Sequence, residues 1–210
     1  MKKTLTVLLA LVLVIAMSVA GTMAYLTSED SVTNTFTVGN VQIKLDEAPV
    51  DANGAATTGD RVKANSYKLI PGHTYNKDPM VTVLKGSESS YIKMTVTFTK
   101  SAELDAIFAP TGAVLTSIFN GYDSANWIAK GNTEDTTANT RTYEFWYKEA
   151  VAAPTADVKL DALFDSITVP GTITNTQLES IKGMTITVNA YAIQADGFDT
   201  PDAAWAAYKA

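Results

Sequence analysis

The residues of this chain that could carry out chemistry are few and scattered. The single histidine, His73, lies in the segment PGHTY, and the chain contains no cysteine. A zinc peptidase of the HExxH type requires two histidines on one helical face with a glutamate between them, and that motif is absent. A serine hydrolase would need His73 as its base together with a G-x-S-x-G turn, which is also absent. We therefore expect no catalytic residue and no enzyme activity, and we interpret His73 as a turn residue.

Three aspartates have a spacing that could form a cation site. Asp157, Asp161 and Asp165 stand at i, i+4 and i+8, so in a helix they would share one face. The apolar residues between positions 160 and 164 also have helical spacing, which predicts a helix there. Carboxylates gathered on one face could bind a cation. A solvated acidic face is the simpler interpretation, and we predict no metal site and no cofactor.

A dense run of aromatic residues raises sugar binding as an alternative. Tyr143, Phe145, Trp146 and Tyr147 lie within a segment that alternates as a strand does. Alternation sends these rings to both faces of a sheet, and core packing is the expected use of most of them. Exposure of Trp146 on a concave surface would favour a carbohydrate-binding module, whereas its burial would remove that case.

Short β-strands are expected to hold most of these residues. The clearest covers residues 91–99, where an apolar residue occupies every second position. Further strands are predicted over residues 41–45, 67–70, 80–84, 114–119, 127–129, 142–148, 167–170 and 184–194, with a polar loop over 131–140. Helices are predicted over 101–108, 160–164, 177–181 and from Thr200 onward, the last docking through Trp205 and Tyr208. Many short strands with turns between them predict an all-β, antiparallel β-sandwich with short helical inserts.

The N-terminal region is predicted to direct export. Two lysines precede an almost wholly apolar run over residues 5–19, and small residues follow it. This layout is typical of a cleaved secretory signal over residues 1–24, cut between Ala24 and Tyr25 or, alternatively, after Ala20. Removing it leaves 14 basic against 22 acidic residues. That balance opposes nucleic-acid binding, which needs clustered lysine and arginine.

A polar arm separates the predicted signal from the predicted domain. Residues 25–35 are mostly polar, and Phe36 and Val38 then alternate with threonines as in a half-buried strand. The apolar phase shifts by one residue at Gly39-Asn40. Because such a shift turns side chains to the opposite face, the arm over residues 25–40 need not belong to the same sheet as the domain over residues 41–210.

Three segments resemble one family. GTMAYLTSEDSVTNTFTVGNVQIKLDE is similar to the N-terminal region of substrates of the SipW-type signal peptidase, the TasA and camelysin family. PGHTYNKDPMVTVLKGSESSYIKMTV resembles a segment of its clostridial members, the SipW-dependent biofilm matrix proteins. AYAIQADGFDTPDAAW resembles their final strand and helix. No single motif is diagnostic, but their order along the chain is fairly specific.

The resemblance implies a structural role. It predicts a jelly-roll subunit of a Gram-positive bacterium, secreted or wall-associated, that assembles with copies of itself into biofilm matrix fibres. A SipW-type signal peptidase would free the arm, and an accessory protein could anchor or nucleate the fibres. The arm would then insert into a neighbour as a donor strand, with Val32, Phe36 and Val38 as candidate side chains for pockets.

Other interpretations stay open at this point. The arm's residues alone favour an unstructured terminus, and only the resemblance brings strand donation to even terms with that interpretation. A cell-surface carbohydrate-binding module is one alternative function. A camelysin-like metalloendopeptidase is another, disfavoured because the chain lacks HExxH.

Overall fold

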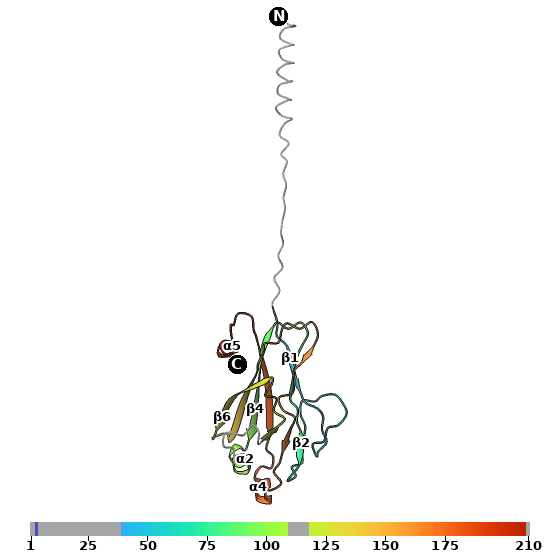
Figure 1. Ribbon diagram of the computed structural model, residues 1–210, viewed down its shortest axis with the longest axis vertical. Coiled ribbons are helices and arrows are strands. Elements are labelled where there is room, and N and C mark those ends of the chain that lie inside the picture. The colour runs from blue at the N-terminus through green and yellow to red at the C-terminus, as the bar shows by residue number, and fades with distance from the viewer. Residues whose placement is uncertain (1–2, 4–38, 109–117, 209–210) are drawn as a thin grey trace. The chain divides into compact units, whose positions relative to one another are not determined.

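The computed structural model describes residue 3 and residues 39–108 and 118–208 (Figure 1). The chain divides into two units, Met1–Thr37 and Val38–Ala210, and the fold is that of the second. The predicted cleavage site at Ala24 and Tyr25 lies outside the described residues, as do the candidate donor residues Val32, Phe36 and Val38. Within the described ranges, no helix is both long enough and apolar enough to cross a membrane.

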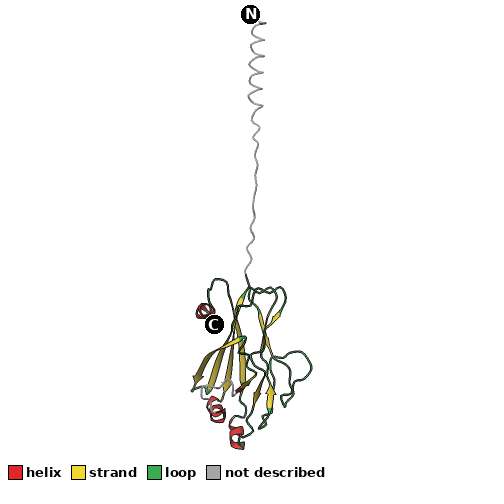
Figure 2. Cartoon of the chain, in the orientation of Figure 1, coloured by secondary structure: helices red, strands yellow, loops and turns green. Residues whose placement is uncertain are grey.

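The protein is an antiparallel β-sandwich with three short helices in its described part (Figure 2). Its strands are β1 Ile43–Asp46, β2 Thr74–Asn76, β3 Met80–Val83, β4 Ser90–Thr99, β5 Phe119–Asn120, β6 Trp127–Asp135, β7 Thr140–Tyr147, β8 Val158–Lys159, β9 Ser166–Thr168 and β10 Ile186–Gln194. The helices are α2 Ser101–Phe108, α4 Asn175–Ser180 and α5 Pro201–Ala207. The predicted all-β fold class is therefore confirmed.

The strands form three sheets around one core. One sheet has the order β10-β4-β7-β6, and it faces two smaller sheets with the orders β1-β3-β8 and β2-β9-β5 (Figure 1). Every strand pair in these sheets is antiparallel. Phe119 of β5 joins the layers, because its ring lies 5.6 Å from that of Phe98 on β4 and 6.1 Å from that of Phe145 on β7.

Strand β4 is the centre of the larger sheet. Its inward residues are Ile92, Met94, Val96 and Phe98, all essentially inaccessible to solvent, and its outward residues are half-buried. Full burial of such side chains stabilises a fold by roughly 1.5–3 kcal/mol each. The strict alternation in the sequence is thus a direct consequence of one face packing on the core.

Three of the predicted elements are wrong. Residues 160–164 are not helical but connect β8 to β9, and the chain is held there by Leu160 N–H donating to Val81 O at 2.9 Å. Leu160, Leu163 and Phe164 are buried all the same, so their spacing reflects core contacts rather than a helix. Residues 67–70 belong to no strand, although Lys68 N–H donates to Ala52 O at 2.7 Å. The predicted polar loop over 131–140 is largely strand, because β6 continues to Asp135 as an exposed edge whose outward residues are polar.

Candidate functional site: an open groove beside strand β10

Strand β10 forms an edge of the larger sheet. It pairs with β4 along its whole length, from Ile186 opposite Phe98 to Gln194 opposite Ser90. Among the described strands, none pairs with its other side. Edge strands leave backbone N–H and C=O groups available to a further strand. In the part of the chain that the structure describes, the outer side of β10 is therefore unpaired, although β1 lies near it.

The opposite edge of the same sheet is protected, and β10 is not. Strand β6 carries Lys130, Glu134 and Asp135, is exposed along most of its length, and has a register shift between Ala129 and Gly131. Charges and bulges of this kind prevent edge-to-edge pairing. Strand β10, with the sequence ITVNAYAIQ, has no charge and no proline. Of the two edges, only β10 is suited to accept another strand.

A groove of about 1050 Å³ runs along the first part of β10. It is lined on β10 and just before it by Met184, Ile186 and Val188, and also by residues 62–69. Apolar side chains that line it further are Leu45, Leu104, Leu178, Ile181, Ile167 and Val169. Ile186 and Val188 are only half-buried, although their partners on β4, Phe98 and Val96, are buried. Among residues 39–108 and 118–208, the core therefore leaves these two side chains only partly covered.

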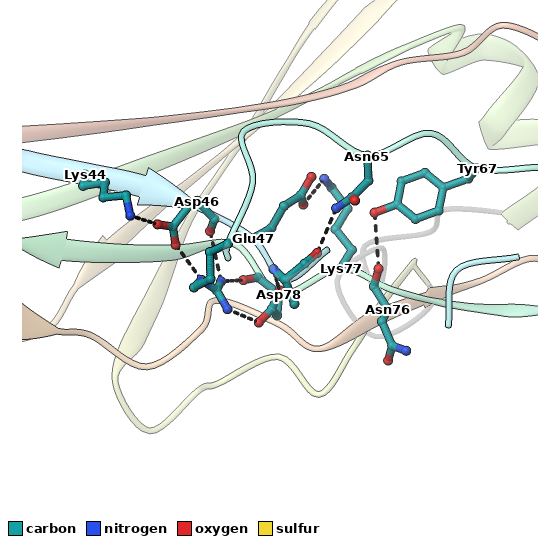
Figure 3. A network of polar contacts seen from close by, with 10 residues as sticks. Lys44, Asp46, Glu47, Asn65, Tyr67, Asn76, Lys77 and Asp78 are labelled. Carbon is teal, nitrogen blue, oxygen red and sulfur yellow. Dashed lines mark hydrogen bonds and ion pairs between the residues drawn. The ribbon is translucent and has the colours of Figure 1, made fainter. Parts of the chain in front are cut away.

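A buried ion pair lines the same groove. Lys77 Nζ donates to Glu47 Oε2 at 2.6 Å, and their side chains are 6% and 9% exposed (Figure 3). An ammonium has three N–H donors and a carboxylate about four acceptor positions. Within the described residues this is the only hydrogen bond of either side-chain charged group. Both therefore keep hydrogen-bonding capacity beside the apolar side chains of the groove.

Arg61 fixes the chain beside this pair. Its guanidinium donates to Asp46 Oδ1 at 2.5 Å and to Asp78 Oδ2 at 2.7 Å, and it also reaches the backbone oxygens of both aspartates. Burial of Asp46 opposes its charge, but hydrogen bonds from Lys44 and Arg61 outweigh that effect and hold the pKa of Asp46 below its ordinary value. These bonds tie the end of β1 and the β2–β3 connection to the loop that precedes the groove wall.

Two polar side chains that line the groove, Asn65 and Tyr67, form hydrogen bonds with the backbone. The Tyr67 hydroxyl donates to the backbone oxygen of Asn76 at 3.2 Å, and the Asn65 amide donates to Ala48 O at 3.0 Å and accepts from Val50 N–H at 3.1 Å (Figure 3). Burial, and then the negative charge of Glu47, raise the pKa of Tyr67 well above its ordinary value. Tyr67 is therefore a neutral, hydrogen-bonded side chain at physiological pH.

Of the three candidate metal ligands, Asp161 and Asp165 line one surface pocket together with Asp123, whereas Asp157 does not line it. Asp157 Oδ1 accepts from Lys85 N–H at 2.9 Å, whereas Asp161 Oδ2 accepts from Asn126 Nδ2 at 2.9 Å. The helix predicted over residues 160–164, which would have aligned the three aspartates, is not formed. His73 follows a turn, and its ring lies edge-on to Tyr75 at 5.1 Å. In the described ranges, no three His, Cys, Asp or Glu side chains are grouped to hold a metal ion.

The aromatic residues of β7 are largely buried, and Trp146 is covered by helix α5. Trp146 is 9% exposed, lies 6.2 Å from Trp205 of α5, and donates from Nε1 to Glu144 Oε1 at 2.6 Å. Trp205 also lies 4.6 Å from Lys93 Nζ, a cation–π contact between α5 and β4. The predicted docking of α5 through Trp205 and Tyr208 is confirmed. Burial of Trp146 removes the case for sugar binding on this platform.

Comparison with known proteins adds no further constraint. No family model, curated protein or solved structure matches the chain. The groove itself was missed by sequence reasoning. The signal that could have indicated it is the uncharged, proline-free strand β10, which contrasts with the charged β6.

Proposed function

We propose that this protein is a secreted, non-enzymatic subunit of extracellular matrix fibres that assembles by strand addition. The observation that carries the proposal is the unprotected edge of β10 beside an open part of the core. The resemblance of the N-terminal region to SipW-type signal peptidase substrates supports the same role. In this proposal, cleavage after Ala24 frees the arm, and copies of the chain are the principal partners.

The arm has the length and pattern that the groove requires. Residues 184–188, which are the two residues before β10 and its first three, form one wall of the groove, and a strand of that many residues is about 17 Å long. A strand of five to seven residues fills such a length, and the arm over residues 25–40 is long enough to supply one. Val32, Phe36 and Val38 share one face of an extended chain and would complete the core beside Ile186 and Val188.

The position of Gly39 supports a head-to-tail assembly in this proposal. Glu88 N–H donates to Asn40 O at 2.8 Å, so the domain begins at the Ser90 end of β4. The groove lies at the opposite end, where Ile186 pairs with Phe98. The ten residues of β4 separate these ends by about 30 Å. An arm that leaves one copy therefore meets the groove end of the next, and an association that does not close on itself gives a filament.

Strand direction favours insertion between copies over insertion within one copy. An arm folded back over its own domain would run from the Phe98 end towards Gly39, parallel to β10. An arm arriving from a copy stacked in the same orientation would run antiparallel to β10. The strand pairs of the described sheets are all antiparallel, and antiparallel pairing is the more stable per residue.

Electron microscopy of the chain beginning at Tyr25 tests the proposal. We expect fibres from this chain, none when a tag blocks Tyr25, and a folded monomer when residues 25–35 are deleted. Fibres that persist after the deletion would exclude the arm as the donor.

Cysteine pairs test the direction of the strand, because the chain has no cysteine of its own. We expect Phe36→Cys with Met184→Cys, and Val32→Cys with Val188→Cys, to give disulfide-linked ladders between copies. Links within one copy, formed instead by Val32→Cys with Met184→Cys, would indicate parallel insertion and contradict the head-to-tail arrangement.

A further inference from the structure

One polar side chain interrupts the apolar face of the arm. Val32, Asn34, Phe36 and Val38 occupy alternate positions, so in an extended strand all four point to the same side. If Val32 and Phe36 enter the groove, the amide of Asn34 is buried between them. A buried amide without hydrogen-bond partners costs about 1–3 kcal/mol, so Asn34 requires both a donor and an acceptor in the groove.

A buried pair of side chains in the groove, Glu47 and Lys77, offers both an acceptor and a donor. Lys77 Nζ and the Glu47 carboxylate lie side by side at 2.6 Å, line the groove, and share only one side-chain hydrogen bond within the described residues. Of the other polar side chains that line the groove, Asp46 is held by Lys44 and Arg61, and Asn65 and Tyr67 bind the backbone. Ser66, Lys68 and Thr187 also line it, but their side chains are exposed to solvent, so they are not buried partners for an inserted amide.

We propose that Glu47 and Lys77 form a polar subsite of the groove that binds an amide side chain of the inserted strand, namely Asn34 of a second copy. This inference rests on the proposed function. The amide oxygen accepts from the Lys77 ammonium, and the amide nitrogen donates to the Glu47 carboxylate. Val32 and Phe36 then pack on the apolar lining to either side.

The subsite would set the register of the strand. An apolar groove alone tolerates shifts of two residues, because each shift returns an apolar side chain to the same face. With the ion pair present, a shift by two places Val32 or Phe36 against buried charges and leaves Asn34 in an apolar pocket. Single buried polar contacts are known to fix register in this way at a cost in stability. The same contact would disfavour arms of other proteins whose inward face is wholly apolar.

The test compares two leucine substitutions in the chain beginning at Tyr25. Asn34→Leu removes the amide at nearly constant volume, and Thr35→Leu makes a similar change on the opposite face. Fibre elongation is followed by light scattering, with morphology checked by electron microscopy. We expect Asn34→Leu to slow elongation roughly tenfold or more relative to Thr35→Leu, which corresponds to the loss of a buried hydrogen-bonded group.

A change in the groove provides the reciprocal test. When the groove carries Glu47→Leu and Lys77→Met, it should prefer an apolar side chain at position 34. Chains with these two changes and Asn34→Leu should therefore elongate faster than chains with these two changes and the original Asn34. Circular dichroism establishes that the double variant is folded; if it is not, the comparison of Asn34→Leu with Thr35→Leu decides alone.

The outcomes separate this inference from the function on which it rests. Equal elongation of Asn34→Leu and Thr35→Leu, both forming fibres, would refute the subsite and leave strand addition intact. Absence of fibres from the unaltered chain would refute strand addition, and the subsite with it.

Discussion

Replacing Lys77 by methionine should destabilise the domain strongly. The substitution leaves the Glu47 carboxylate, 9% exposed, without its ammonium partner. Removing one member of a buried ion pair costs about 3–5 kcal/mol, because the remaining charge stays out of water. For a domain of this size that corresponds to a fall in Tm of roughly 10 °C. Replacing both members, as Glu47→Leu with Lys77→Met, should recover most of this loss, because no buried charge remains.

Lys182 provides a matched control for this measurement. Lys182 Nζ lies 3.2 Å from Glu179 Oε2, but both side chains are more than 70% exposed. Exposed pairs contribute about 0–1 kcal/mol, so Lys182→Met should change stability little. Urea denaturation monitored by tryptophan fluorescence, on chains lacking residues 25–35, keeps unfolding separate from assembly. If Lys77→Met and Lys182→Met have the same midpoint, the ion pair is not buried in the way that we describe.

Three further predictions follow from the same contacts. Val188→Lys should abolish fibres, because it places a charge on the groove wall, whereas Val158→Lys, on the short exposed strand β8, should not; electron microscopy of the two variants decides. The free energy of unfolding should fall as the pH drops below about 4. The pKa of Asp46 is lower in the folded state than its unfolded value of about 3.9, so the ionised carboxylate stabilises the fold above that pH. This stabilisation is lost as the carboxylate of the folded protein becomes protonated. Asp46→Asn should then flatten the pH dependence of the unfolding free energy in acid. Trp205→Ala should cost about 3–5 kcal/mol, measured by urea denaturation, because it removes the side chain that docks α5 on the sheet; a cost below 1 kcal/mol would mean that α5 is not packed there.

Local patterns predicted the elements whose formation depends on their own residues. Strand β4 followed from strict alternation. Helix α5 followed from Thr200 and Pro201, and the Thr200 hydroxyl does accept from Ala203 N–H at 3.2 Å. Residues 160–164 were mispredicted because burial against β3 imposed a helix-like apolar spacing on an irregular connection.

The groove could not have been predicted in the same way. Its existence depends on which strand is last in the sheet order, and that order joins β10 to β4, which are far apart in sequence. The pairing of Glu47 with Lys77 is likewise set by the packing of the chain after β1 against the β2–β3 connection. Only the lack of charge in β10 was visible in the sequence.

The separation of Gly39 from the groove by the length of β4 has a consequence for how such a fibre would grow and stop. Its two tips are chemically different, since one presents an empty groove and the other an unused arm. A copy that lacks residues 25–35 can still receive an arm but cannot offer one, so it acts as a chain terminator. A small fraction of such copies would shorten every fibre in the mixture, in the same way that a monofunctional monomer limits the length of a synthetic polymer.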